Sequence, residues 1–109
     1  DCYALVKDYY AEKLHIDLPD CERPEGWEES GNSLILEHFK EFGFESVPLT
    51  DLRENDVLAM RVGSDIVNHV SVYIGDTMIL HHVKDHLSAR DVYGSFWRRA
   101  TVKCLRYTK

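Results

Sequence analysis

Cys2, His69 and His81 are the residues of this sequence whose types could together perform nucleophilic chemistry. Cys2 follows Asp1, a residue type that often caps helices, at the start of an amphipathic segment. In the first turn of a helix, unpaired backbone N–H groups and the positive end of the helix dipole favour an anion such as a thiolate. A histidine beside such a cysteine can accept its proton. The sequence therefore predicts a cysteine nucleophile with an imidazole base.

Strand parity decides which second histidine can join this pair. In the strand expected around His69, the side chains of His69 and Ser71 share one face. A three-residue hairpin loop over residues 75–77 would pair Ser71 with His81 and would place His81 diagonal to His69, within reach of a ring-to-ring hydrogen bond. A two-residue loop would reverse the parity and place His82 there instead. We predict His81 as the third site residue and keep His82 as the alternative.

Each of these residues also has a purely structural interpretation. A cysteine in the first turn of a helix is more often a small buried apolar residue, and a strand histidine is usually a hydrogen-bonded structural residue. A thiolate with two imidazoles could also bind zinc, so a metal site is a further alternative. We nevertheless predict neither a metal nor another cofactor. Other residues receive structural roles: Cys21 and Cys104 as packing residues, His15, His38 and His86 as surface residues, and Tyr93 and Trp97 as core or site wall.

Length and composition limit the classes of protein to which this chain could belong. A chain of 109 residues is expected to form one domain that buries roughly two-thirds of its unfolded surface. The net charge of −6 argues against a nucleic-acid partner. Three widely spaced cysteines cannot all pair and form no CxxC motif, so we expect free thiols. No apolar run is long enough for a membrane span, and no signal peptide is evident. The start at Asp1 suggests a domain excised from a longer protein.

The first element expected to position the site is an N-terminal helix. Its apolar and aromatic side chains recur with the helical period, at positions 2, 5, 6, 9, 10 and 14. Pro19 restricts the residue before it, so the helix should stop near residues 17–20. The acidic loop that follows, residues 20–31, carries Trp27. Trp27 could serve as a contact surface for a ligand or as a lid on the core.

After a second helical segment, the spacing of apolar residues changes from the period of a helix to that of a strand. A second helix over residues 34–42 is expected to end at Gly43, and residues 44–49 are expected to be an extended connection. Asn55 suits a turn with positive φ, and Asp76 a hairpin turn. Four strands are expected, over residues 57–62, 68–74, 78–83 and 100–107. The result is an α+β domain with its helices on one face of an antiparallel meander.

Three segments and one histidine together carry a family resemblance. They are residues 1–6 (DCYALV), 55–58 (NDVL) and 68–76 (NHVSVYIGD), followed by His81. These segments resemble the NlpC family of papain-like cysteine peptidases. The family pattern is a D-C-S-G start, a strand bearing H-x-G-I-Y-I-G, and a polar third residue, commonly histidine, twelve positions after the catalytic histidine. His69 and His81 are separated by twelve positions.

A second set of residues narrows the resemblance within that family. Tyr3, the pair at residues 9–10 and the stretch 90–97 (RDVYGSFW) are similar to the NlpC-type domains of phage tail-tip proteins. Together with the first set, the resemblance covers nearly the whole chain. Two departures are mild: Ser71 replaces the glycine after the strand histidine, and Asn55 replaces the glycine of a P-G-D turn.

The resemblance implies a papain-like fold and a Cys-His-His mechanism. In that mechanism His69 accepts the proton of Cys2, and His81 orients the His69 ring. The backbone N–H of Cys2 would donate to the oxyanion. Family members cleave peptide bonds of bacterial peptidoglycan, often after γ-D-glutamate. We expect the substrate to contact three further residues: Trp27, Ser71 and His82.

The resemblance also implies partners and a location. A domain of a phage tail tip would meet other phage tail proteins and the peptidoglycan of the host, and would act at the bacterial cell wall. The alternative function is a structural or partner-binding module of the tail tip that keeps the fold and has lost turnover. The acidic segment over residues 22–29 would suit such a binding role.

Overall fold

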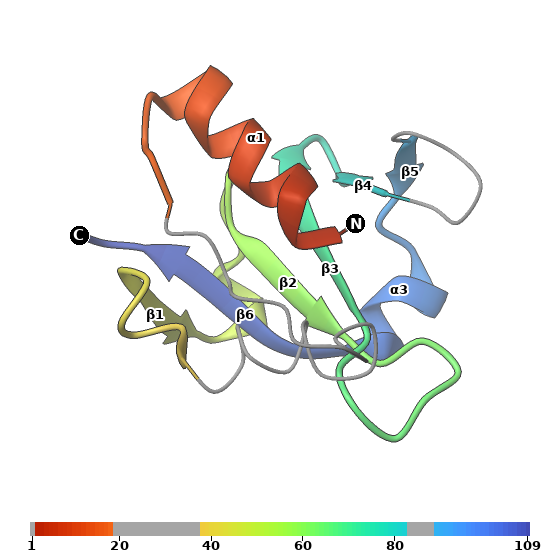
Figure 1. Ribbon diagram of the computed structural model, residues 1–109. Helices are drawn as coiled ribbons and strands as arrows, with labels where there is room; N and C mark the ends of the chain where they lie inside the picture. The colour runs from red at the N-terminus through yellow and green to blue at the C-terminus, as the bar shows by residue number, and fades with distance from the viewer. Residues whose placement is uncertain (1, 19–37, 83–88) are drawn as a thin grey trace.

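The computed structural model describes residues 2–18, 38–82 and 89–109 (Figure 1). The described elements, in chain order, are α1 (Cys2–Leu14), β1 (Phe44–Val47), a 3-10 turn (Leu49–Asp51), β2 (Val57–Met60), β3 (His69–Gly75), β4 (Met78–His81), β5 (Ala89–Val92), α3 (Ser95–Ala100) and β6 (Thr101–Tyr107). The strands form one antiparallel sheet in the order β1-β6-β2-β3-β4-β5. This arrangement confirms the α+β class. No helix in these ranges is long and apolar enough to cross a bilayer.

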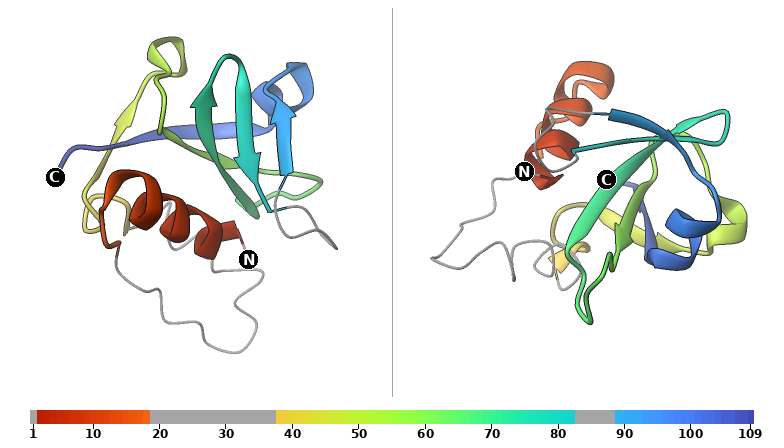
Figure 2. Two further views of the ribbon diagram at one scale, coloured as in Figure 1. Left: turned by 90° about the horizontal axis from the view of Figure 1, so that it is seen from above. Right: turned by 90° about the vertical axis from the view of Figure 1, so that its right-hand side faces the viewer.

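The sheet buries a separate apolar cluster on each face. Along β2, Val57 and Ala59 pack with α1, whereas Leu58 and Met60 pack with Trp97 of α3. The two helices therefore cover opposite faces of the sheet, as the turned views of Figure 2 also show. The expected placement of helices on one face holds for α1 only. Helix α3 was not expected, because its six residues are too few to show a helical period.

Helix α1 is anchored to the turn before β2 by two tyrosines. The Tyr9 hydroxyl donates to Asn55 Oδ1 at 2.6 Å, and the Tyr10 hydroxyl donates to the Asn55 carbonyl oxygen. Asn55 has the predicted positive φ, at 79°. The helix ends where His15 takes a left-handed conformation with φ of 55°, and the Ile16 N–H donates to the Tyr10 carbonyl at 3.0 Å. These contacts hold the helix, and hence its first residue Cys2, in one position on the sheet.

Both edge strands differ from the expectations. Residues 44–49 are not merely a connection, because Phe44–Val47 form β1 and pair with β6. β5 was not expected at all, and it pairs with β4. Each edge strand has four residues, so its alternation alone is a weak signal, and pairing with a distant segment decides its structure. Most of the expected helix over residues 34–42 lies outside the described residues, and residues 39–43 form turns.

An ion-paired cluster holds the ends of β2 and β6 together. Asp56 is 2% exposed and accepts two hydrogen bonds from the Arg106 guanidinium, Nε to Oδ1 at 3.0 Å and Nη2 to Oδ2 at 2.8 Å. The backbone N–H of Arg53 also donates to Asp56 Oδ2, at 2.9 Å. Arg106 reaches Asp51 as well, with Nη1 to Oδ2 at 3.1 Å. A buried carboxylate with this many donors depends on Arg106 to balance its charge.

We therefore expect Arg106→Leu to lower the free energy of unfolding by about 3 kcal/mol, because it leaves the Asp56 carboxylate buried without its cation. Urea denaturation would measure this loss. The matched control is Arg53→Leu, whose side chain is 66% exposed and pairs with Asp51 at the surface; it should cost less than about 1 kcal/mol. Equal losses in the two variants would contradict the assignment.

Candidate functional site

His69 and His81 form a hydrogen-bonded pair where β3 and β4 lie side by side. His69 Nε2 lies 2.8 Å from His81 Nδ1, and the ring planes meet at 73°. The His81 side chain is fully buried, whereas His69 is partly exposed. The predicted ring-to-ring hydrogen bond is therefore confirmed. Two imidazoles joined in this way can accept a proton at one end and stabilise the resulting charge at the other.

The β3–β4 hairpin brings His81 beside His69 with a loop length and a register that differ from those expected. The loop has two residues, Asp76 and Thr77, both with positive φ (54° and 63°), so the expectation of a three-residue loop was wrong. A two-residue loop alone would have faced His82 toward the site. The register shifts between Tyr73 and Gly75, where Ile74 is an extra residue. This β-bulge restores the pairing of Ser71 with His81.

Asp91 extends the pair into a chain of three groups. Asp91 Oδ2 lies 2.8 Å from His81 Nε2, on the opposite side of the ring from His69. Asp91 comes from β5, which pairs with β4 so that Ile79 faces Asp91. We did not predict this residue as part of the site. The available signal was an acidic residue on a short segment next to the histidine strand, and it becomes informative only when β5 is known to pair with β4.

Trp97 of α3 forms one wall of the histidine pair. Its ring stacks on His69, with centroids 5.7 Å apart and planes at 29°. The same ring meets His81 edge to face, with centroids 4.8 Å apart and planes at 86°. These contacts confirm the prediction that Trp97 belongs to the core or the site wall. Tyr93, by contrast, is fully buried and bonds Thr101 Oγ1 at 2.6 Å, so it belongs to the core.

The surroundings of His69 keep its ring neutral near pH 7. Burial has the largest effect, and the neighbouring His81 and His82 add to it; together they lower the pKa of His69 from 6.5 to about 4. A neutral imidazole has a lone pair that can take a proton. Burial opposes the protonated form, so an anion beside the ring is needed to stabilise it.

Some of the other predicted site residues lie within the described part of the structure and others do not. Cys2 is the first residue of α1, which packs against β3 and β4, but its side chain lies outside the described part of the structure. Trp27 also lies outside the described residues. Ser71 is fully buried between β2 and β4, and its hydroxyl has no hydrogen-bond partner among the described residues. His82 follows β4 directly and is partly exposed. Their catalytic and substrate-binding roles remain predictions.

The other cysteine that the structure describes has no reactive character. Cys104 is 2% exposed, and its Sγ lies 3.6 Å from Asp56 Oδ2. Burial, with the nearby Asp56 carboxylate, raises the pKa of its thiol to about 12. The prediction that Cys104 is a packing residue is confirmed, and His15 is exposed as expected. Cys21 and His86 lie outside the described residues.

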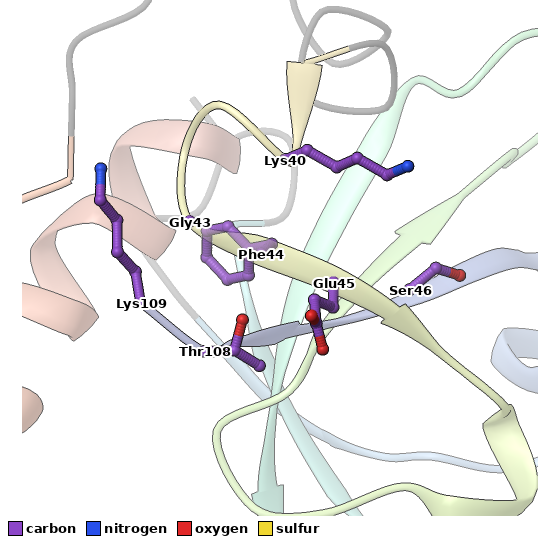
Figure 3. Close-up of a pocket in the computed structure, with 7 residues that line it drawn as sticks. All are labelled: Lys40, Gly43, Phe44, Glu45, Ser46, Thr108 and Lys109. Carbon is purple, nitrogen blue, oxygen red and sulfur yellow. The ribbon is translucent and has the colours of Figure 1, made fainter.

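A pocket at the other edge of the sheet does not compete with this site. The pocket lies beside β1 and is lined by Lys40, Gly43, Phe44, Glu45, Ser46, Thr108 and Lys109. Figure 3 shows the amino groups of Lys40 and Lys109 pointing away from each other, so they do not converge on a ligand. Within the described ranges, no group of three His, Cys, Asp or Glu side chains could hold a metal ion.

The pKa of His69 leads to a prediction about stability. The unfolded chain binds a proton at this residue below about pH 6.5, whereas the folded chain does so only near pH 4. Stability is therefore full above pH 6.5 and is lost as the pH falls toward 4. We expect a loss of roughly 2 kcal/mol between pH 6.5 and 4.5 from this group. Urea denaturation across this range should show a shallower decline for His69→Gln than for the wild type.

The matched control for this measurement is His15→Asn, which removes an exposed histidine and tolerates the same left-handed backbone conformation. It should follow the wild-type decline. If His69→Gln lost stability as steeply as the wild type, the lowered pKa of His69 would not be the cause of the decline.

Comparison with known proteins identifies the family of this chain. Residues 1–106 match the NlpC/P60 family. The tail tip assembly protein K of Escherichia phage lambda is 36% identical over 107 residues, which cover 98% of this chain and 53% of that protein. The tail tip assembly protein K of Escherichia phage N15 is 32% identical over 109 residues, covering 98% and 44%. The chain thus spans about half the length of these relatives. With a family match over almost its whole length, this chain belongs to the NlpC/P60 family.

Proposed function

We propose that this chain is a papain-like cysteine peptidase domain that cleaves peptide stems of bacterial peptidoglycan. The single observation that carries the proposal is the hydrogen bond of 2.8 Å between His69 Nε2 and His81 Nδ1. In this proposal the partly buried His69 of β3 is the base, and packing of α1 against β3 supports it, because α1 begins at Cys2. Family membership supports the same chemistry. The whole sequence forms this single domain in our proposal.

The proposed reaction starts with proton transfer from the Cys2 thiol to His69. The resulting thiolate lies at the N-terminus of α1, where backbone N–H groups and the helix dipole stabilise a negative charge. It also offsets the cost of charging the buried His69 ring. His81 accepts a hydrogen bond from His69 Nε2–H and keeps that ring in place. In this proposal the proton transfer from Cys2 to His69 requires no metal.

The thiolate then attacks the carbonyl carbon of the scissile peptide bond. The negative charge that develops on the carbonyl oxygen is stabilised by the backbone N–H of Cys2. Collapse of this intermediate breaks the C–N bond, and the His69 imidazolium gives its proton to the departing amine. Water, deprotonated by His69, attacks the thioester; the carboxylic acid leaves and the Cys2 thiol is restored.

The proposed substrate bond follows γ-D-glutamate and precedes diaminopimelate. Trp27, Ser71 and His82 remain our proposed substrate contacts. Of these, the partly exposed His82 adjoins His81 directly. The names of the two relatives support a location in a phage tail tip, with other tail proteins as partners and the host cell wall as the place of action. The proposed reaction uses no cofactor.

A second candidate function is a structural module of the tail tip without turnover. The observation that favours it is that both relatives are named for tail tip assembly. This module would keep the histidine pair as a packing feature. The two functions differ in the reactivity of Cys2 and in turnover, so two measurements separate them.

The first measurement is digestion of defined muropeptides, read by mass spectrometry. We expect the purified protein to cleave a γ-D-glutamyl-diaminopimelate bond and Cys2→Ala to lose this activity by at least about a thousandfold, because the nucleophile is gone. Cys104→Ala is the matched control and should retain cleavage once folding is verified. Intact muropeptide after prolonged incubation with wild-type protein would favour the structural module.

The second measurement is alkylation by iodoacetamide at pH 6, mapped by peptide mass spectrometry. We expect Cys2 to react at least about tenfold faster than Cys104, because a thiol at a helix start beside an imidazole is deprotonated at lower pH than a buried thiol. Equal rates with no turnover would support the module without activity. Zinc bound stoichiometrically after dialysis would instead indicate a metal site.

A further inference from the structure

We propose that Asp91 is a positioning residue that sets the protonation pattern of the His69–His81 pair, so that His69 presents an unprotonated Nδ1 to Cys2. Asp91 acts only through His81 and touches no reacting atom. The inference rests on the proposed role of His69 as the base. It concerns a residue outside the Cys-His-His set, from an edge strand that brings a carboxylate to the far side of the pair.

The Asp91 carboxylate fixes the position of the proton on His81. An ionised carboxylate only accepts hydrogen bonds, so the contact of 2.8 Å between Asp91 Oδ2 and His81 Nε2 requires the proton of His81 to be on Nε2. The Asp91 side chain is 46% exposed, so water can solvate the charge of its carboxylate. A neutral imidazole carries one proton. In the proposed pattern the His81 ring carries this single proton on Nε2, so its Nδ1 is a lone-pair acceptor.

The position of the proton on His81 in turn fixes the position of the proton on His69. His81 Nδ1 lies 2.8 Å from His69 Nε2, and a hydrogen bond at this distance needs one donor. Because His81 Nδ1 has no proton, His69 Nε2 must carry it. The His69 ring is neutral near pH 7, so its Nδ1 carries the lone pair. The base nitrogen is thus chosen by a carboxylate two hydrogen bonds away.

The reversed pattern shows why Asp91 matters. If His81 carried its proton on Nδ1, it would donate to His69 Nε2, and the proton of His69 would be on Nδ1. His69 would then have no lone pair at the nitrogen that the proposed mechanism uses. Both patterns satisfy the bond between the rings equally well. Among the described contacts of the two rings, the bond to Asp91 is the one that distinguishes them.

Packing restricts both imidazole rings. His81 is fully buried, and the Trp97 ring contacts both imidazoles, so rotation of either ring would require the Trp97 side chain to move. Pairing of β4 with β5 positions Asp91 relative to His81. The same negative charge also favours the imidazolium that forms when His69 takes a proton. Asp91 thus supports both the correct starting pattern and the charged intermediate.

The test is long-range ¹H–¹⁵N NMR of histidine-labelled protein at pH 8, together with kcat/KM for a muropeptide. In the wild type we expect both His69 and His81 to be protonated on Nε2 alone. Asp91→Leu should produce a detectable population protonated on Nδ1 and lower kcat/KM by at least about tenfold. Asp91→Glu should restore the Nε2 pattern and part of the activity. Asp91→Asn can donate to His81 Nε2 and should favour the reversed pattern.

The matched control is Asp65→Leu, which removes an exposed carboxylate from the turn before β3 and should change neither readout. Circular dichroism verifies that each variant is folded. Unchanged histidine signals in Asp91→Leu, or a wild-type His81 protonated on both nitrogens, would overturn the proposal. If the wild type showed no turnover but Asp91→Leu still altered the His81 signals, the proposed peptidase would fail while the positioning role of Asp91 stood.

Discussion

The pairing of β3 with β4 is the constraint on which the candidate site depends. Side chains alternate along a strand, so a shift of one residue would exchange His81 for His82. The turn at Asp76 and Thr77 sets one parity, and the bulge at Ile74 reverses it. The bond between the two histidines is therefore a product of two irregularities that act together. A regular hairpin with the same loop would have separated them.

The rest of the fold holds the two sides of this site in place. One face of the sheet packs against α1, whose tyrosines bind the turn at Asn55, and this attachment positions the helix start. The other face packs against α3, which brings Trp97 against both histidine rings. The ion pair of Asp56 and Arg106 joins β2 to β6. The helix that carries the proposed nucleophile and the wall of the histidine pair thus come from opposite layers.

The electrostatics of the site favour a neutral His69 ring near pH 7. Burial and the neighbouring His81 and His82 lower the pKa of His69 to about 4, so the ring is neutral near pH 7. Cys104 is kept protonated by burial and by the nearby Asp56. The negative charge of Asp91 lies at the edge of the sheet, where water solvates it. In the proposed mechanism, a thiolate beside the ring would offset the cost of protonating His69 near pH 7.

The sequence was enough to predict the residue types, the helical period after Cys2, the strands β2, β3, β4 and β6, and the family. These are local properties, because periodicity and motif spacing are read within one segment. The three-dimensional structure was needed to establish the bulge at Ile74, the edge strands β1 and β5 and the contact of Asp91 with His81. Short strands have weak preferences of their own, and pairing with segments far along the chain decides them. The carboxylate was visible in the sequence, but its partner was not.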